Sequence, residues 1–170
     1  MSSTCERNHD VGFSTDLYID RDISARLVVK AFSRALNLKP GQVALFPVDD
    51  FEARQESWAD PVIRVLVLKT TIPGDFPLGL DLRMKDDRPA DFDAFVSSIS
   101  KTIGAPVLTD ETGIDPAFAD DWFMVTPDGA KSVVTADSEA LAADVPALRL
   151  TPQSRLFYEA HRGTALAPTG

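Results

Sequence analysis

The stretch VIRVLVLKTTIPGDFPLGLDLRM, residues 62–84, decides the fold of this chain. Residues 62–71 are an apolar and β-branched run, which is typical of a strand. In residues 78–84, leucine and methionine alternate with glycine, aspartate and arginine, as a strand with one buried face requires. The Pro-Gly-Asp triplet at 73–75 favours a turn. The stretch therefore predicts two strands that pair through a tight connection.

The residues before this pair predict a strand and a long helix. Residues 13–19 alternate apolar and polar side chains, as an opening strand does. Residues 22–38 carry apolar side chains at helical spacing, wide enough for a mostly buried helix. Asp20 or Asp22 offers an N-cap oxygen for this helix. Asn37 suits the left-handed residue at its end.

The residues after the pair predict a second helix and a hairpin. Residues 89–103 have apolar side chains at helical spacing, and Gly104 stops the pattern. Two short strands, 122–126 and 130–136, flank a Pro-Asp-Gly turn. We expect Gly129 to take a positive φ in this turn, because glycine adopts that conformation without steric cost.

The order of elements predicts an α+β fold with a mixed or mainly antiparallel sheet of six to eight strands and two helices on one face. We expect a single domain over residues 1–170, with loose termini at 1–10 and 163–170. The remaining elements are short: strands at 43–47, 107–109 and 148–151, a polar connection at 49–61 that contains Trp58, and an amphipathic segment at 154–161.

The acidic charge is concentrated in one third of the chain. The net charge is −9, and residues 86–144 carry 13 acidic side chains against Arg88, Lys101 and Lys131. The residues on either side of this stretch are close to neutral. Phosphate backbones repel such a surface, so we expect no nucleic-acid partner. Clustered charge of one sign favours a protein partner of the opposite sign.

The sequence carries none of the motifs that mark common enzymes or cofactor sites. The patterns GxSxG, GxxxxGK[ST] and GxGxxG are absent, and the two histidines, His9 and His161, lack neighbouring ligands. We therefore expect no catalytic residue, no metal site and no cofactor. The lone Cys5, the polar first ten residues and the lack of a long apolar run lead us to expect a cytoplasmic protein without a membrane partner.

Residues 121–129, DWFMVTPDG, together with the following strand and its Asp-rich end, resemble the C-terminal hairpin of some small acidic immunity proteins of bacterial polymorphic toxin systems. The resemblance covers about residues 90–140. It implies a non-enzymatic, one-to-one inhibitor of a toxin encoded nearby. Independently of the family, nuclease toxins are basic because they bind phosphates, so an acidic face would speed the association of an inhibitor with them.

On this hypothesis the partner-binding surface is acidic and includes one tryptophan as an anchor. Two alternatives remain: an adaptor or chaperone for a secreted protein, and an enzyme with a carboxylate site, with or without a metal, at Asp49, Asp50 and Glu52 or at Asp86 and Asp87. The candidate partner-binding residues are Asp86, Asp87, Asp110, Glu111, Asp115, Asp120, Asp121 and Trp122.

Overall fold

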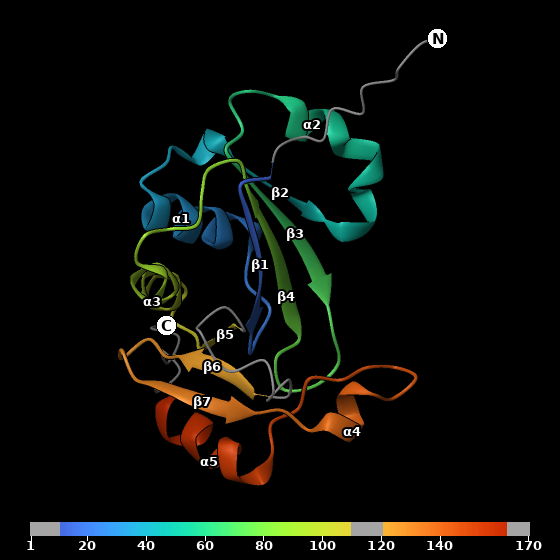
Figure 1. Ribbon diagram of the computed structural model, residues 1–170, viewed down its shortest axis with the longest axis vertical. Helices are drawn as coiled ribbons and strands as arrows, with labels where there is room; N and C mark the ends of the chain where they lie inside the picture. Colours follow the sequence, from blue (N-terminus) through green and yellow to red (C-terminus); the bar gives the residue numbers. More distant parts are fainter. Residues whose placement is uncertain (1–10, 110–120, 163–170) are drawn as a thin grey trace, which may run out of the picture.

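The computed structural model describes residues 11–109 and 121–162, and seven strands in these ranges form one sheet (Figure 1). The strand order is β2-β3-β4-β1-β5-β6-β7. Strands β2 and β3 are parallel, and all the other neighbours are antiparallel. The predicted α+β class, mixed sheet and number of strands are confirmed. The strands are β1 (Phe13–Ile19), β2 (Val43–Pro47), β3 (Val65–Thr71), β4 (Leu78–Met84), β5 (Val107–Thr109), β6 (Asp121–Val125) and β7 (Lys131–Thr135).

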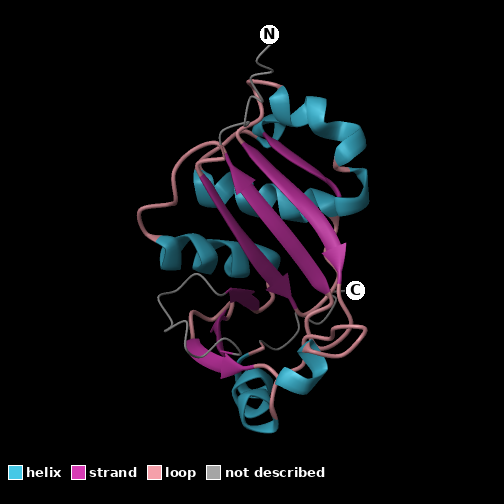
Figure 2. Ribbon diagram, turned by 45° about the vertical axis from the view of Figure 1, so that its right-hand side comes forward, coloured by secondary structure: helices cyan, strands magenta, loops and turns pink. Residues whose placement is uncertain are grey.

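Two helices cover one face of the sheet, as predicted, and shorter segments cover parts of the other face (Figure 2). Helices α1 and α3 pack against each other and against the central strands. Helix α2 packs on the opposite face of β3, and α5 packs on the opposite face beside β7. The helices are α1 (Ala25–Leu36), α2 (Gln55–Ala59), α3 (Phe92–Ile103), α4 (Ser138–Leu141) and α5 (Pro152–His161).

Helix α1 begins later than the sequence predicted, because Ser24 and not an aspartate caps it. The Ser24 hydroxyl accepts a hydrogen bond from the Leu27 N–H at 3.3 Å. Asp22 pairs instead with Lys69 at 2.7 Å, and this hydrogen bond lowers the pKa of Asp22. At the other end Asn37 has φ 54°, the left-handed conformation that the sequence predicted.

Helix α3 has the C-terminal boundary and the buried face that its sequence predicted, but it begins at Phe92 and not at residue 89, because Asp91 caps it. The Asp91 carboxylate accepts a hydrogen bond from the Ala94 N–H at 2.9 Å, and Gly104 ends the helix at φ 68°. Phe95 is 3% exposed and its ring lies 6.2 Å from the ring of Phe32 on α1. The two helices and the sheet therefore share one core.

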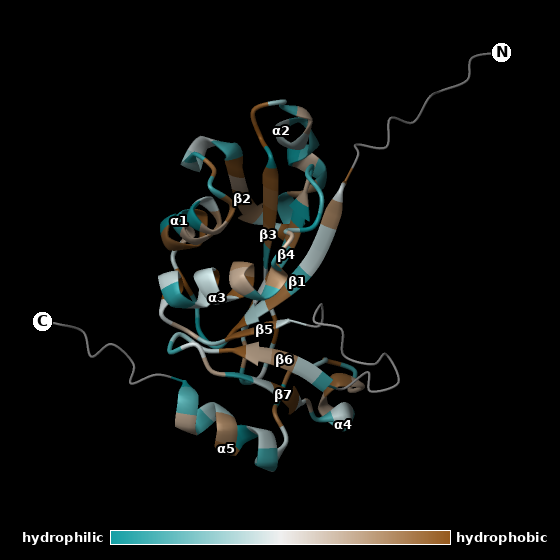
Figure 3. Ribbon diagram, turned by 60° about the vertical axis from the view of Figure 1, so that its left-hand side comes forward, coloured by the Kyte–Doolittle hydropathy of each residue, from teal (hydrophilic) through white to brown (hydrophobic). Residues whose placement is uncertain are grey.

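The cover of the second face was not predicted. Trp58, which we expected in a polar connection, lies on α2 and is 4% exposed because it packs over Leu66 and Leu68. These two leucines belong to β3, whose ribbon is coloured hydrophobic along much of its length (Figure 3). A strand that is apolar on both faces needs cover on both faces. The connection between β2 and β3 therefore has to supply an apolar side chain that covers Leu66 and Leu68, and Trp58 does so.

The C-terminal half contains the predicted hairpin and one wrong prediction. Strands β6 and β7 pair in register, and Gly129 has φ 86° in the turn between them. Residues 148–151 do not form a strand: Leu148 and Leu150 make only isolated bridges, to Gly74 and Ala136. Within 11–109 and 121–162, no helix is long and apolar enough to cross a membrane.

Candidate functional site

Two of the predicted partner-binding residues, Asp86 and Asp87, follow the end of β4. The Asp86 carboxylate accepts hydrogen bonds from both ends of the Arg64 guanidinium, with Nε to Oδ2 at 3.2 Å. These bonds raise the pKa of Arg64. Asp87 is exposed. Of these two carboxylates, Asp86 therefore already has a cationic partner within the chain.

Two others, Asp121 and Trp122, open strand β6. The Asp121 carboxylate accepts a hydrogen bond from the Thr135 hydroxyl of β7 at 2.8 Å. Trp122 is half-buried and meets Tyr18 edge-to-face, with ring centroids 5.3 Å apart. The indole N–H of Trp122 is buried and has no acceptor in the described part of the chain. Asp121 and Trp122 are consecutive residues of one strand, so their side chains point to opposite faces of the sheet. A partner that contacts both side chains must therefore bind at the end of the hairpin.

The structure does not bring these two pairs of residues together. Asp86 lies beyond β4 and Asp121 begins β6, and strands β1 and β5 lie between them. Three interstrand spacings correspond to about 14 Å across the sheet. The predicted Asp110, Glu111, Asp115 and Asp120 lie outside the described residues, in the connection from β5 to β6.

Several other acids of the stretch 86–144 have roles in local structure. Asp91 caps α3, and Asp137 caps α4 by accepting hydrogen bonds from two backbone N–H groups. Asp128 accepts hydrogen bonds from the Thr126 hydroxyl and the Ala130 N–H in the hairpin turn. The bond from Thr126 is the main cause of the lowered pKa of Asp128. Charge counted along the sequence thus overstates the charge available to a partner.

One acid that the sequence analysis did not select follows the strand that pairs with Asp121. Thr135 pairs with Asp121, and the chain then passes from β7 into α4 (Figure 1). Glu139 lies in the first turn of α4 and is exposed. We call Asp121, Trp122 and Glu139 the acidic corner. The only signal for Glu139 in the sequence was its position three residues after the end of the predicted strand 130–136, so the pairing of β6 with β7 was needed to place it.

Strand β7 is an edge of the described sheet, and half of it is open. Ser154 and Thr151 occupy the backbone N–H and C=O of Thr135, at 2.7 and 3.0 Å. The first residues of β7 pair with β6 alone, and Val133 is 51% exposed. An open edge with an exposed apolar residue is a feature of strands that add a partner.

The carboxylate of Asp20, which the sequence analysis considered only as an N-cap, is buried and bonds to α5. The Asp20 side chain is 2% exposed and accepts hydrogen bonds from the Arg21 guanidinium and from the Tyr158 hydroxyl, the latter at 2.8 Å. Burial, followed by the bond to Asp20, raises the pKa of Tyr158 to about 12. This network joins the end of β1 to α5 and so supports the hairpin beneath it.

The carboxylates of the enzyme alternative are spread over short turns. Asp49 and Glu52 are exposed, and Asp50 faces Arg54 at 3.9 Å. In the two described ranges, no group of three or more His, Cys, Asp or Glu side chains is placed to hold a metal ion.

Comparison with known proteins gives no relative from which a function can be transferred. No family model, curated protein or solved structure matches the chain. The resemblance to immunity proteins therefore rests on the hairpin sequence alone, and any functional proposal has to start from the residues of this chain.

Proposed function

We propose that this chain is a non-enzymatic protein-binding domain whose acidic corner binds and inhibits a basic toxin, as an immunity protein does. The observation that carries the proposal is Trp122, a half-buried tryptophan beside Asp121 at the start of β6, whose indole N–H has no acceptor among residues 11–109 and 121–162. Tryptophan residues of this kind frequently anchor protein interfaces.

The energetics of Trp122 favour a role beyond packing. A buried donor without an acceptor costs about 1–3 kcal/mol. Phenylalanine at this position would keep the ring contact with Tyr18 and avoid that cost. A partner that supplies an acceptor to the indole would turn the cost into a contribution to binding.

The charge of the corner favours a basic partner. Asp121 and Glu139 lie within the acidic stretch, and the connection that leads into Asp121 adds Asp110, Glu111, Asp115 and Asp120 in sequence. Acidic groups at an interface rim act mainly on the association rate, and salt screens them. Inhibition of a toxin requires fast association, which this distribution of charge would provide.

The test is capture of the partner from the native host, followed by binding kinetics with the purified pair. We expect a basic toxin domain whose association slows as salt rises. Reversal of Asp120 and Asp121 to lysine should slow association about tenfold at low salt. The matched control reverses Asp49 and Asp50, which changes the net charge equally at exposed turns far along the chain, and should change the rate less than about twofold.

Trp122→Ala adds a second readout. It should act on the dissociation rate and weaken binding by about 2 kcal/mol, as the loss of an interface anchor does. A captured partner that binds the reversed protein at an unchanged, salt-independent rate would contradict the proposal.

A further inference from the structure

Helix α1 carries a row of three cations. Arg26, Lys30 and Arg34 recur at every fourth residue, so they lie along one side of the helix, and all three are exposed. None of them forms a hydrogen bond or an ion pair with a described residue. In a chain with a net charge of −9, this row is a local excess of positive charge.

The stability of the helix does not explain this row. Like charges spaced by four residues repel each other and destabilise a helix. Arg26 lies in the first turn, where the helix dipole disfavours a cation, and that turn contains no acid. Only Arg34, in the last turn, has a favourable place relative to the dipole. The row therefore persists despite a cost to the helix.

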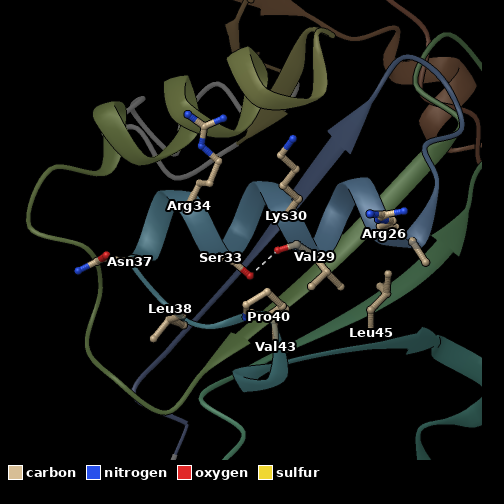
Figure 4. Close-up of a pocket in the computed structure, with 11 residues that line it drawn as sticks. Arg26, Val29, Lys30, Ser33, Arg34, Asn37, Leu38, Pro40, Val43 and Leu45 are labelled. Carbon is tan, nitrogen blue, oxygen red and sulfur yellow. Dashed lines mark hydrogen bonds between the residues drawn. The ribbon is translucent and has the colours of Figure 1, made fainter.

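Arg26, Lys30 and Arg34 are among the residues that line an apolar groove between α1 and β2, which Figure 4 shows in close-up. The groove has a volume of about 840 Å³. The Ser33 hydroxyl within it donates a hydrogen bond to the Val29 carbonyl at 2.7 Å, so this polar group is already satisfied. The floor offers mainly apolar contact, from Val29, Leu38, Pro40, Val43 and Leu45.

The backbone of β2 is poorly suited to bind an extended peptide, although β2 is the edge strand on this side. The Val43 N–H already donates to the Pro40 carbonyl, and Pro47 has no N–H. A strand added to this edge would find few donors. An occupant of the groove must therefore bind through side chains.

The spacing of the cations matches a helical ligand. Arg26 and Arg34 are eight residues apart, which corresponds to about 12 Å along the helix axis. A single carboxylate cannot reach all three cations, whereas acids at every fourth residue of a helix have the same period. We propose that the groove binds an acidic amphipathic helix of a protein partner. Its apolar stripe packs on the floor, and its carboxylates pair with Arg26, Lys30 and Arg34.

This site is separate from the acidic corner and does not rest on the toxin proposal. The groove lies beside β2, at one edge of the sheet, whereas β7 forms the other edge of the described sheet (Figure 1). The two surfaces also have opposite charge. Loss of one activity would leave the other unchanged.

The test uses a labelled synthetic helix of about 18 residues, long enough to populate helix in water. It carries leucines along one stripe and glutamates at every fourth position beside it, and its binding is followed by fluorescence anisotropy. The triple variant Arg26→Glu, Lys30→Glu, Arg34→Glu should bind at least about tenfold more weakly than the native chain. The triple variant Arg54→Glu, Arg149→Glu, Arg162→Glu changes the net charge equally outside the groove and should bind within about twofold.

Four results would overturn the proposal. Two of them concern the peptide: equal affinity of the two triple variants, and equal affinity of the native chain for a scrambled peptide of the same composition. The third is displacement of the peptide by dodecanoate at lower concentration. The fourth is a dimer of the native chain in sedimentation that the α1 variant abolishes. The last two would assign the groove to a small amphiphile or to a second copy of the chain. Should the α1 triple glutamate variant fail to fold by circular dichroism, the same three positions are changed to glutamine and the same affinity loss is required.

Discussion

The acidic stretch 86–144 and helix α1 show two different fates of charged residues. The acidic stretch dominates the charge of the sequence, but Asp91 and Asp137 cap helices and Asp86 pairs with Arg64. On α1 the cations at 26, 30 and 34 have no such role within the described chain. Charge density along a sequence is therefore a weaker guide to a binding surface than the hydrogen bonds that each charged group already makes.

The largest effect on stability should come from the buried face of α3, the helix that Asp91 caps. Phe95→Ala should lower the free energy of unfolding by about 3–5 kcal/mol, because it removes a buried ring that packs on Phe32. The exposed Asp93, on the same helix, is the matched control: it faces Lys131 at 3.9 Å in a surface ion pair, so Asp93→Ala should cost less than about 1 kcal/mol. Urea denaturation measures both. A similar small cost for the two variants would mean that the face of α3 is not part of the core.

The next effect concerns Asp20, an acid outside the stretch with a clear structural role. Tyr158→Phe removes the hydroxyl that donates to Asp20 and should cost about 1.5–3 kcal/mol, the usual range for a hydrogen bond to a charged group. The fold raises the pKa of Tyr158 from 10 to about 12. The stability from this shift is complete below pH 10 and is lost as pH rises toward 12.

Tyrosinate absorbance in a Tyr18→Phe background isolates this titration. Ionisation of Tyr158 near pH 10, the ordinary pKa of tyrosine, would contradict the burial of its hydroxyl and the bond to Asp20.

A smaller effect on stability should distinguish Asp91, which caps a helix, from Asp87, which has no structural role in the described chain. Asp91→Ala should destabilise the protein by about 1 kcal/mol, because it removes the N-cap of α3. Asp87→Ala, a few residues before it, should change stability by less than about 0.5 kcal/mol. Thermal melts of the two variants check the difference. Equal costs would break the distinction on which the comparison rests.

The smallest effect is a gain in stability. Lys30→Glu replaces two repulsive spacings on α1, to Arg26 and Arg34, with two attractive ones, and should raise stability by about 0.5–1 kcal/mol. The same variant should weaken binding of the acidic helix. Lys101→Glu on α3 serves as a control with the same change in charge. A loss of stability for Lys30→Glu would mean that the row contributes to the fold.

The sequence predicted the elements whose signals are local. Apolar spacing indicated α1 and α3, and turn residues such as Gly129 indicated the hairpin. It did not predict that Trp58 is buried, because that depends on which residues of β3 point away from α1. Capping by Ser24 was also missed, since an aspartate two residues earlier fits the same pattern.

The site was harder to predict than the fold. Whether Asp86 and Asp121 meet depends on the order of strands, and the order places β1 and β5 between them. The groove beside β2 exists because α1 packs over a parallel edge strand, and no local pattern reports that contact. Both features follow from tertiary arrangement and not from residue type.

The most direct test of two separate binding surfaces is hydrogen–deuterium exchange of the chain alone, with its captured partner, and with the synthetic acidic helix. The account predicts that the partner protects backbone amides in residues 121–141, around the acidic corner, and leaves residues 26–45 unchanged. The acidic helix should protect residues 26–45 and leave 121–141 unchanged. Protection of the same residues by both ligands, or protection of neither region, would contradict the account.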